Sequence, residues 1–291
     1  MANFREYSAK LISMSGMRRV TSTMKMVAAS HLHRAQTELH LPKPFADQLR
    51  QLSNLARLEQ FKKHRLCLPP PERDPHILLL VMTSDRGLCG SFNSTVIREV
   101  RRWLKEQTET RNAHVEAVYA GQKGYTALWH DIAPCMKALN LTAHPHIQET
   151  APISTFALDS FMAQRFDEVW VAGNRFVSTM THETKVRRLL PYDLAKLDKI
   201  QESKTAPTCI IEPQDNRLLE ALMRQWMHYS VYFAQLNRAA SEQASRVIAM
   251  ENATVNLRRM EKELILLRNR ARQAAITNEL TEIVSGAESL G

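Results

Sequence analysis

The sequence predicts an α/β protein with one long helix at each end of the chain, and three observations support this fold class. No proline follows Pro213 and no glycine follows it before Gly286, so the last seventy-odd residues contain no helix breaker. Residues 3–40 are free of proline and contain a single glycine, Gly16. Between these two stretches, strand-like apolar segments alternate with helix-like segments, which is typical of a sheet covered by helices.

The C-terminal helix is expected to begin near Asn216 and to carry an apolar seam. The seam residues recur at alternating steps of three and four, which is the spacing of a coiled coil. They are Met250, Ala253, Leu257, Met260, Leu264, Leu267, Ala271 and Ala274. After Ala274 the apolar residues move to another face, at Ile276, Leu280, Ile283 and Val284. The end of this helix should therefore pack against a different partner.

The N-terminal helix is expected over residues 3–40. Its apolar stripe is interrupted at Arg18 and otherwise consists of Phe4, Tyr7, Leu11, Met14, Thr21, Met24, Ala28, Leu32, Ala35 and Leu39. Pro42 and Pro44 should end it, and a further helical pattern runs over residues 48–61. We expect the two long helices to pack as an antiparallel coiled coil; packing on separate neighbours is the alternative.

The middle of the chain is expected to form a parallel sheet with helices on its faces. Strands are predicted over residues 76–83, 115–120 and 168–172, followed by strands or a hairpin at 176–177 and 186–190, and a strand at 208–211. Helices are predicted over residues 95–105, 121–129 and 155–165. The chain should thus have three parts: an N-terminal helical segment (1–68), an α/β domain (69–212) and a C-terminal helix (213–291).

Positive charge is concentrated near the N-terminus. The formal net charge is +9, and residues 1–68 carry 12 lysines and arginines against four acidic residues. Such a segment predicts an acidic partner, which could be protein, phosphate or a membrane surface. No apolar run approaches the roughly 18 residues of a membrane span, and the first ten residues do not resemble a secretory signal. The four cysteines form no CxxC pair, so free thiols are expected.

The turn Ser84–Ser91 is the segment most similar to an enzyme motif. Its spacing is Gly-x-x-Gly, which matches neither the dinucleotide-binding fingerprint nor the P-loop, so a structural turn is favoured over a phosphate site. Cys89 could act as a nucleophile only with a base such as His114, which the sequence cannot place near it. The adjacent carboxylates Asp167 and Glu168 should point to opposite faces of a strand. We expect no catalytic residue, no cofactor and no metal site.

Four segments match one protein family in the order in which they occur. They are TMKMVAAS (23–30), SDRGLCG (84–90), SEQASR (241–246) and NRARQAAITNELTEIVSGA (269–287), which together span nearly the whole chain. These segments resemble the gamma subunit of F-type ATP synthases. One departure is Ser30-His31-Leu32-His33, which stands where the family commonly carries lysine.

The resemblance implies an antiparallel coiled coil of the two terminal helices and a Rossmann-like α/β domain without a nucleotide. It implies a non-catalytic rotor subunit in the central stalk of a proton-translocating ATP synthase. Such a subunit couples rotation of the membrane c-ring to conformational change at the catalytic sites of the alpha/beta ring. Such coupling requires an element with two stable states, and contact with a partner must shift the balance between those states.

The resemblance also implies partners and contact residues. The partners are the alpha and beta subunits, the c-ring and a small central-stalk subunit (epsilon or delta), with no nucleic acid. Residues at contact positions are Met24, Lys25, Arg272, Gln273, Thr277 and Glu279. The location implied is peripheral, on the matrix side of the mitochondrial inner membrane or, alternatively, on the cytoplasmic face of a bacterial plasma membrane.

Two other functions are kept as alternatives. A dinucleotide-dependent enzyme would bind a nucleotide as a purified chain, but the fingerprint is missing. A basic coiled-coil protein that binds nucleic acid would lose affinity steeply with salt. The nearly balanced charge of residues 216–291, with ten basic and eight acidic side chains, argues against this second alternative.

Overall fold

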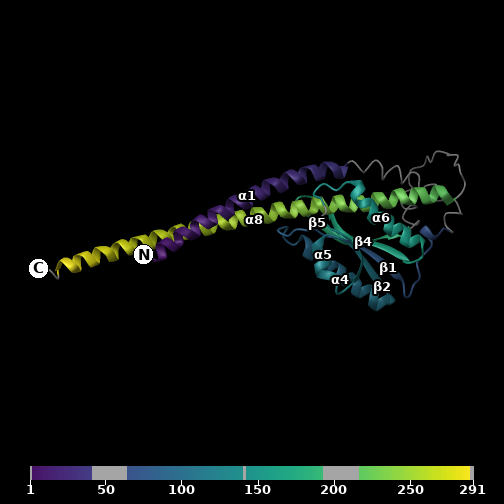
Figure 1. Ribbon diagram of the computed structural model, residues 1–291, viewed down its shortest axis with the longest axis horizontal. Coiled ribbons are helices and arrows are strands. Elements are labelled where there is room, and N and C mark those ends of the chain that lie inside the picture. The colour runs from purple at the N-terminus through teal and green to yellow at the C-terminus, as the bar shows by residue number, and fades with distance from the viewer. Residues whose placement is uncertain (1, 41–63, 140–141, 193–215, 289–291) are drawn as a thin grey trace. The chain divides into compact units, whose positions relative to one another are not determined.

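The computed structural model describes residues 2–40, 64–139, 142–192 and 216–288 (Figure 1). The chain forms two compact units. One, here called the helical unit, contains the residues up to Ala28 and those from Arg246 onward; the other, the α/β unit, runs from Ala29 to Ser245. The helical pattern expected over 48–61, the strand expected over 208–211, and Cys209 lie outside the described residues.

The α/β unit contains a five-stranded sheet with the order β3-β2-β1-β4-β5. The strands are β1 His76–Met82, β2 His114–Ala120, β3 Ala133–Ala138, β4 Glu168–Phe176 and β5 His182–Leu190. The pairings among β1 to β4 are parallel, whereas β5 forms an antiparallel hairpin with β4. The predicted fold class is therefore confirmed. The prediction missed β3, a short edge strand of sequence APCMKA that shows neither an apolar run nor clear alternation.

Helices cover both faces of the sheet (Figure 1). On one face, Ile77, Leu79 and Val81 of β1 pack against α4 (Phe92–Arg111) and α5 (Gln122–Leu128). On the other face, the alternate residues of β1 pack against α6 (Ile147–Met162) and the first part of α8 (Asn216–Glu288). Burial on both faces explains why β1 is apolar almost throughout.

Helix α6 begins earlier than the sequence predicts. It starts at Ile147, before the expected residue 155, and continues through Pro152. A proline removes one helical hydrogen bond. Here the apolar face made by Ile153, Ala157 and Phe161 is buried in the core of the α/β unit, so tertiary packing outweighs the local preference to break.

Within the α/β unit, α1 (Ala2–His40) packs against α8 through small and aliphatic side chains. Leu32, Ala35 and Leu39 form one buried cluster with Leu236, Ala240 and Ala244. Phe176, Tyr232 and Phe233 cover this cluster. The contact between the two helices in this unit is therefore an apolar cluster.

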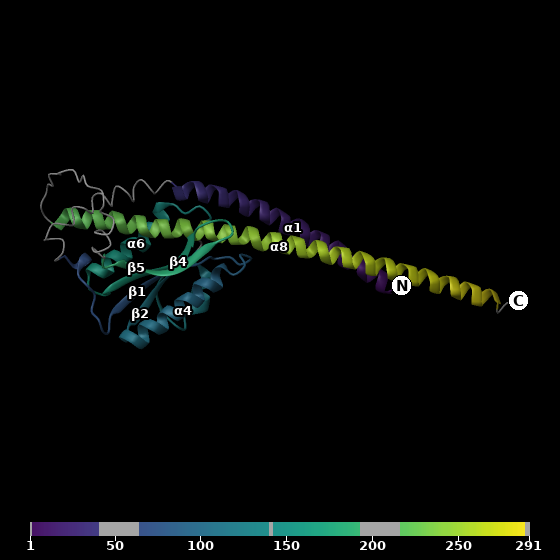
Figure 2. The same cartoon turned by 180° about the vertical axis from the view of Figure 1, so that it is seen from behind.

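Within the helical unit, the same two helices are joined by polar pairs. The hydroxyl oxygens of Thr21 and Thr254 lie 3.0 Å apart, Arg18 Nε lies 3.0 Å from a carboxylate oxygen of Glu261, and Lys25 forms an ion pair with Glu251. As residue numbers rise along α1, their partners' numbers fall along α8. The predicted antiparallel arrangement is therefore confirmed; Figure 2 shows the pair from behind.

The seam differs from the prediction by one residue at alternate positions. Met260 and Leu267 are 41% and 42% exposed, whereas Thr254 is buried and Glu261 is partly buried. On α1, Met24 is 39% exposed and the next residue, Lys25, makes the contact. Arg18, expected to interrupt the stripe, lies in the contact. Apolar spacing alone did not predict these contact positions, because the residues that occupy them are polar and form hydrogen bonds or ion pairs across the two helices.

Candidate functional site

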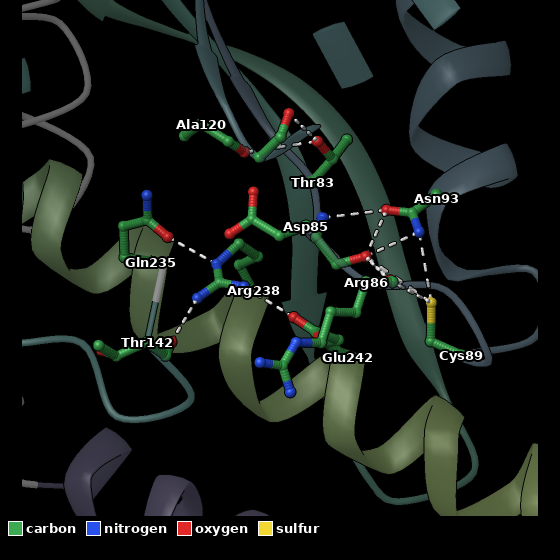
Figure 3. A network of polar contacts seen from close by, with 12 residues as sticks. Thr83, Asp85, Arg86, Cys89, Asn93, Ala120, Thr142, Gln235, Arg238 and Glu242 are labelled. Carbon is green, nitrogen blue, oxygen red and sulfur yellow. Dashed lines mark hydrogen bonds and ion pairs between the residues drawn. The ribbon is translucent and has the colours of Figure 1, made fainter. Parts of the chain in front are cut away.

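The Gly-rich turn after β1 lies at the carboxyl edge of the sheet, where open α/β sheets bind ligands. Its polar groups bond to one another (Figure 3). The Ser84 backbone N–H donates to Asn93 Oδ1 at 3.0 Å. Asn93 Nδ2 in turn lies 2.8 Å from Ser84 Oγ and 3.3 Å from Cys89 Sγ. The first turn of α4 thus holds the loop closed through Asn93.

The turn after β2 packs directly on this loop. The Gln122 N–H donates to Asp85 Oδ1 at 2.8 Å, and the Gly124 N–H donates to Thr83 Oγ1 at 2.9 Å. A Cβ added at Gly121, whose φ is +114°, would lie 2.4 Å from the Thr83 carbonyl oxygen, and one at Gly124 would lie 2.6 Å from Thr83 Oγ1. These glycines are therefore explained by the close approach of two turns, without a phosphate.

A buried charge cluster on α8 adjoins the residue Thr142 (Figure 3). Arg238, which is 2% exposed, donates from Nε to Gln235 Oε1 at 2.6 Å and from its terminal nitrogens to Glu242 Oε2 at 2.7 Å and to the Thr142 carbonyl at 3.0 Å. Sequence reasoning missed this cluster. The available signal was an arginine and a glutamate four residues apart within a stretch of apolar and small residues.

The candidate nucleophile Cys89 is not brought near His114. Cys89 follows the carboxyl end of β1, whereas His114 begins the parallel strand β2 and stacks on His76 at the amino end of β1, with ring centroids 5.2 Å apart. Burial raises the pKa of the Cys67 and Cys135 thiols to about 11, which makes them poor nucleophiles.

The two adjacent carboxylates have separate structural partners. Asp167 accepts the His76 N–H at 3.0 Å. The carboxylate of Glu168 is buried, and it accepts from Arg111 and from the Trp170 indole N–H, both at 2.5 Å. These bonds lie at the amino edge of the sheet. The two carboxylates therefore bind different partners.

The histidines of α1 also have different environments. His31 faces His144, whereas His33 is exposed. Among the described residues, no group of three or more His, Cys, Asp and Glu side chains is arranged to hold a metal ion. In the same part of the chain, none of the helices has an apolar stretch long enough to cross a bilayer.

The residues expected to contact partners form two groups in the helical unit. Met24 and Lys25 lie on α1, where the hydrogen bond and charge of Lys25 lower the pKa of Glu251 below its usual value. The second group lies on α8 and is exposed throughout: Arg272, Gln273, Thr277 and Glu279. Near this second group, four exposed apolar side chains occupy the end of α8: Ile276, Leu280, Ile283 and Val284.

Comparison with known proteins gives consistent matches over the whole chain. The model of a family described as ATP synthase matches residues 3–290. The ATP synthase gamma chain of Cupriavidus necator is 35% identical over 295 residues, which cover all of both chains. The gamma chain of a Geobacter species is 33% identical, with 100% of this chain and 99% of the relative covered.

Solved structures give the same result. The central stalk/c-ring structure of the mitochondrial ATP synthase of Tetrahymena thermophila contains a chain that is 30% identical, with a TM-score of 0.61 over 80% of this chain and 99% of that one. A chain of the Euglena gracilis mitochondrial ATP synthase is 18% identical, with a TM-score of 0.67 over 99% and 95%, and supports the fold. The chain therefore belongs to the ATP synthase family, and within it to the gamma chains.

Proposed function

We propose that this chain is the central-stalk rotor subunit of a proton-translocating ATP synthase. It has no active site of its own; it couples rotation of the membrane c-ring to conformational change at the catalytic sites of the alpha/beta ring. The observation that carries this proposal is the match to gamma chains over the full length. The similarity to the Tetrahymena central stalk supports the same role.

The helical unit suits contact with a surrounding ring. Its two helices are joined by polar pairs, and α8 presents exposed polar and apolar side chains near its C-terminal end. We propose that Arg272, Gln273, Thr277 and Glu279 contact beta subunits there, with Met24 and Lys25 forming a second contact. Arginine suits such a contact because its fork makes charge-assisted bonds to carboxylates and carbonyls.

The α/β unit would then serve the membrane-facing partners. The chain similar to this one in Tetrahymena belongs to a central stalk/c-ring structure, which supports the c-ring as a partner here. A small central-stalk subunit, epsilon or delta, completes the proposed set of partners, and no nucleic acid is among them. The division into segments 1–68, 69–212 and 213–291 remains part of this proposal.

The proposed location of the chain in the cell is inferred from its proposed partners. A c-ring partner places the chain at a membrane as a peripheral subunit. The relatives from Cupriavidus and Geobacter are bacterial and cover the whole chain, so we favour the cytoplasmic face of a bacterial plasma membrane. The Tetrahymena and Euglena chains support the other prediction, the matrix side of a mitochondrial inner membrane.

Reconstitution tests the proposed function. The complete complex is assembled in vesicles with and without this chain, and ATP hydrolysis and ATP-driven proton pumping are measured on both. We expect pumping only when the chain is present, and no ATP hydrolysis by the chain alone. Pumping by a complex that lacks the chain, or micromolar ATP or NAD binding by the purified chain in calorimetry, would contradict the proposal.

A further inference from the structure

The segment Thr142–His146, here called the strap, connects to three helices of the α/β unit. From α8, Arg238 donates to the Thr142 carbonyl at 3.0 Å (Figure 3). From α1, His31 Nδ1 lies 2.8 Å from His144 Nε2, and Glu38 Oε1 lies 3.8 Å from His144 Nδ1. The strap therefore joins the two long helices to each other through its own backbone and one imidazole.

The strap is also anchored at the start of α6. The Thr142 hydroxyl lies 2.9 Å from a carboxylate oxygen of Glu149 and 2.7 Å from the His144 carbonyl. The strap immediately precedes α6, which packs on the sheet through Ile153 and Ala157. The strap therefore links α6 to α1 through the His144–His31 contact and to α8 through the Arg238–Thr142 hydrogen bond.

The direct contact between α1 and α8 in this unit is of a different kind. It consists of small and aliphatic residues such as Ala35 and Ala240. Apolar burial is non-directional, so helices that slide or turn can form equivalent contacts again. The bonds from the strap to Arg238 and His31 are partly buried. A hydrogen-bond network of this kind favours one register, because a displaced donor or acceptor loses its partner where water reaches it poorly.

We propose that the strap is the element that prevents the two long helices from slipping on the α/β unit under load, with Arg238 and His144 as its positioning residues. This inference rests on the proposed rotor function. Arg238 is suited to this role because it is buried and bonds Gln235, Glu242 and the strap at once. His144 is suited because one ring contacts both His31 and Glu38 of α1.

The test compares Arg238→Met with Arg224→Met in the assembled ATP synthase. Arg224 is a matched control: it lies on the same helix, its side chain is 49% exposed, and it pairs with Asp159 at 3.6 Å. Both variants are reconstituted in vesicles, and the ratio of protons pumped to ATP hydrolysed is measured as the opposing proton gradient rises. For Arg238→Met we expect hydrolysis to continue and the ratio to fall several-fold under load. For Arg224→Met we expect the wild-type ratio.

Two further variants keep the test decisive if Arg238→Met does not assemble. Arg238→Lys keeps the charge and loses the fork, and His144→Phe keeps a planar ring and loses both contacts to α1; each should lower the same ratio to a smaller extent. A wild-type ratio under load in assembled Arg238→Lys and His144→Phe overturns the inference. An equal loss of hydrolysis and pumping overturns it as well, because that pattern indicates general damage rather than slip.

The result also separates this inference from the proposed function. If the wild-type complex pumps only when this chain is present, and the strap variants pump equally well, the rotor function holds and only the strap is wrong. If the wild-type complex pumps without this chain, the proposed function itself has failed.

Discussion

The helices α1 and α8 contact each other differently in the two units of the molecule. In the α/β unit, Ala35 and Ala240 are fully buried, and aromatic side chains cover the contact. In the helical unit, the contact contains the Thr21–Thr254, Arg18–Glu261 and Lys25–Glu251 pairs, and most surrounding side chains are partly or fully exposed. The same pair of helices thus has an apolar cluster at its contact in the α/β unit, and polar pairs beside partly buried apolar side chains at its contact in the helical unit.

This difference indicates which unit contributes most of the stability of the helix pair and which unit presents surface to partner subunits. Burial of apolar area is the main favourable term in folding, whereas exposed ion pairs contribute little. The free energy of helix pairing should therefore be concentrated in the α/β unit. In the helical unit the polar pairs set the register and leave a wide surface open to partner subunits.

The largest expected effect comes from making the same substitution in both units. Leu236 is fully buried in the α/β unit, and Leu264 is partly exposed in the helical unit. We expect Leu236→Ala to lower the free energy of unfolding by about 3 kcal/mol. Leu264→Ala should lower it by roughly 1 kcal/mol, because less apolar surface is lost. Urea unfolding of the purified chain measures both, and equal losses would contradict the comparison.

The second prediction concerns the exposed end of α8. Arg272→Ala combined with Gln273→Ala should leave the chain folded and assembled, because both side chains are exposed. If the pair contacts beta subunits at only some rotor angles, its loss should change turnover of the complex by about ten-fold, which corresponds to ~1.4 kcal/mol. The readouts are ATP hydrolysis and proton pumping of the assembled complex. Wild-type rates of both ATP hydrolysis and proton pumping would mean that Arg272 and Gln273 contact solvent and no partner subunit.

A smaller effect is expected for the polar pairs of the helical unit. A double-mutant cycle on Arg18→Ala and Glu261→Ala should give a coupling energy of less than about 1 kcal/mol, because the pair is partly solvated. The matched cycle on Arg238→Ala and Glu242→Ala, both buried, should give at least about 2 kcal/mol. Thermal or urea unfolding of the seven chains (the shared wild type, four single mutants and two double mutants) provides the values. A larger coupling for the exposed pair would reverse the comparison.

The smallest effect is expected from mild acid, and it should separate the two units. Burial lowers the pKa of His228, with a further contribution from the charge of Arg224, and burial also lowers the pKa of His182 below 6.5. Each then binds a proton less readily in the folded than in the unfolded chain. Their stabilisation is therefore fully present above pH 6.5 and is lost as the pH falls below it.

The helical unit should not respond in this range. Residues 1–28 and 246–291 contain no histidine, and the pKa of Glu251 is lowered from 4.5, so its contribution is lost only in stronger acid. Hydrogen exchange between about pH 7 and pH 5, corrected for the intrinsic rate, should show loss of protection in the α/β unit alone. His228→Gln should reduce that loss. Equal loss in both units would contradict this prediction.

The long helices and most strands could be predicted because their signals are local. Proline, glycine and residue spacing act within a few positions of the chain, and they indicated α1, α8, β1, β2 and β4. The edge strand β3 gave no such signal, because it is stabilised by pairing with β2 rather than by its own pattern. Helix α6 began before its proline because packing on the sheet outweighed the local cost.

The sequence by itself determined that the chain would contain two long amphipathic helices, an α/β sheet and the motifs of its family, since each follows from residue type and spacing. Only the tertiary structure decided that Glu261 rather than Met260 faces α1, and that Arg238 bonds Thr142 across 96 positions of the chain. The physical reason is that a spacing pattern marks a face to within about one residue. Which residue of that face makes the contact depends on a partner that the pattern does not contain.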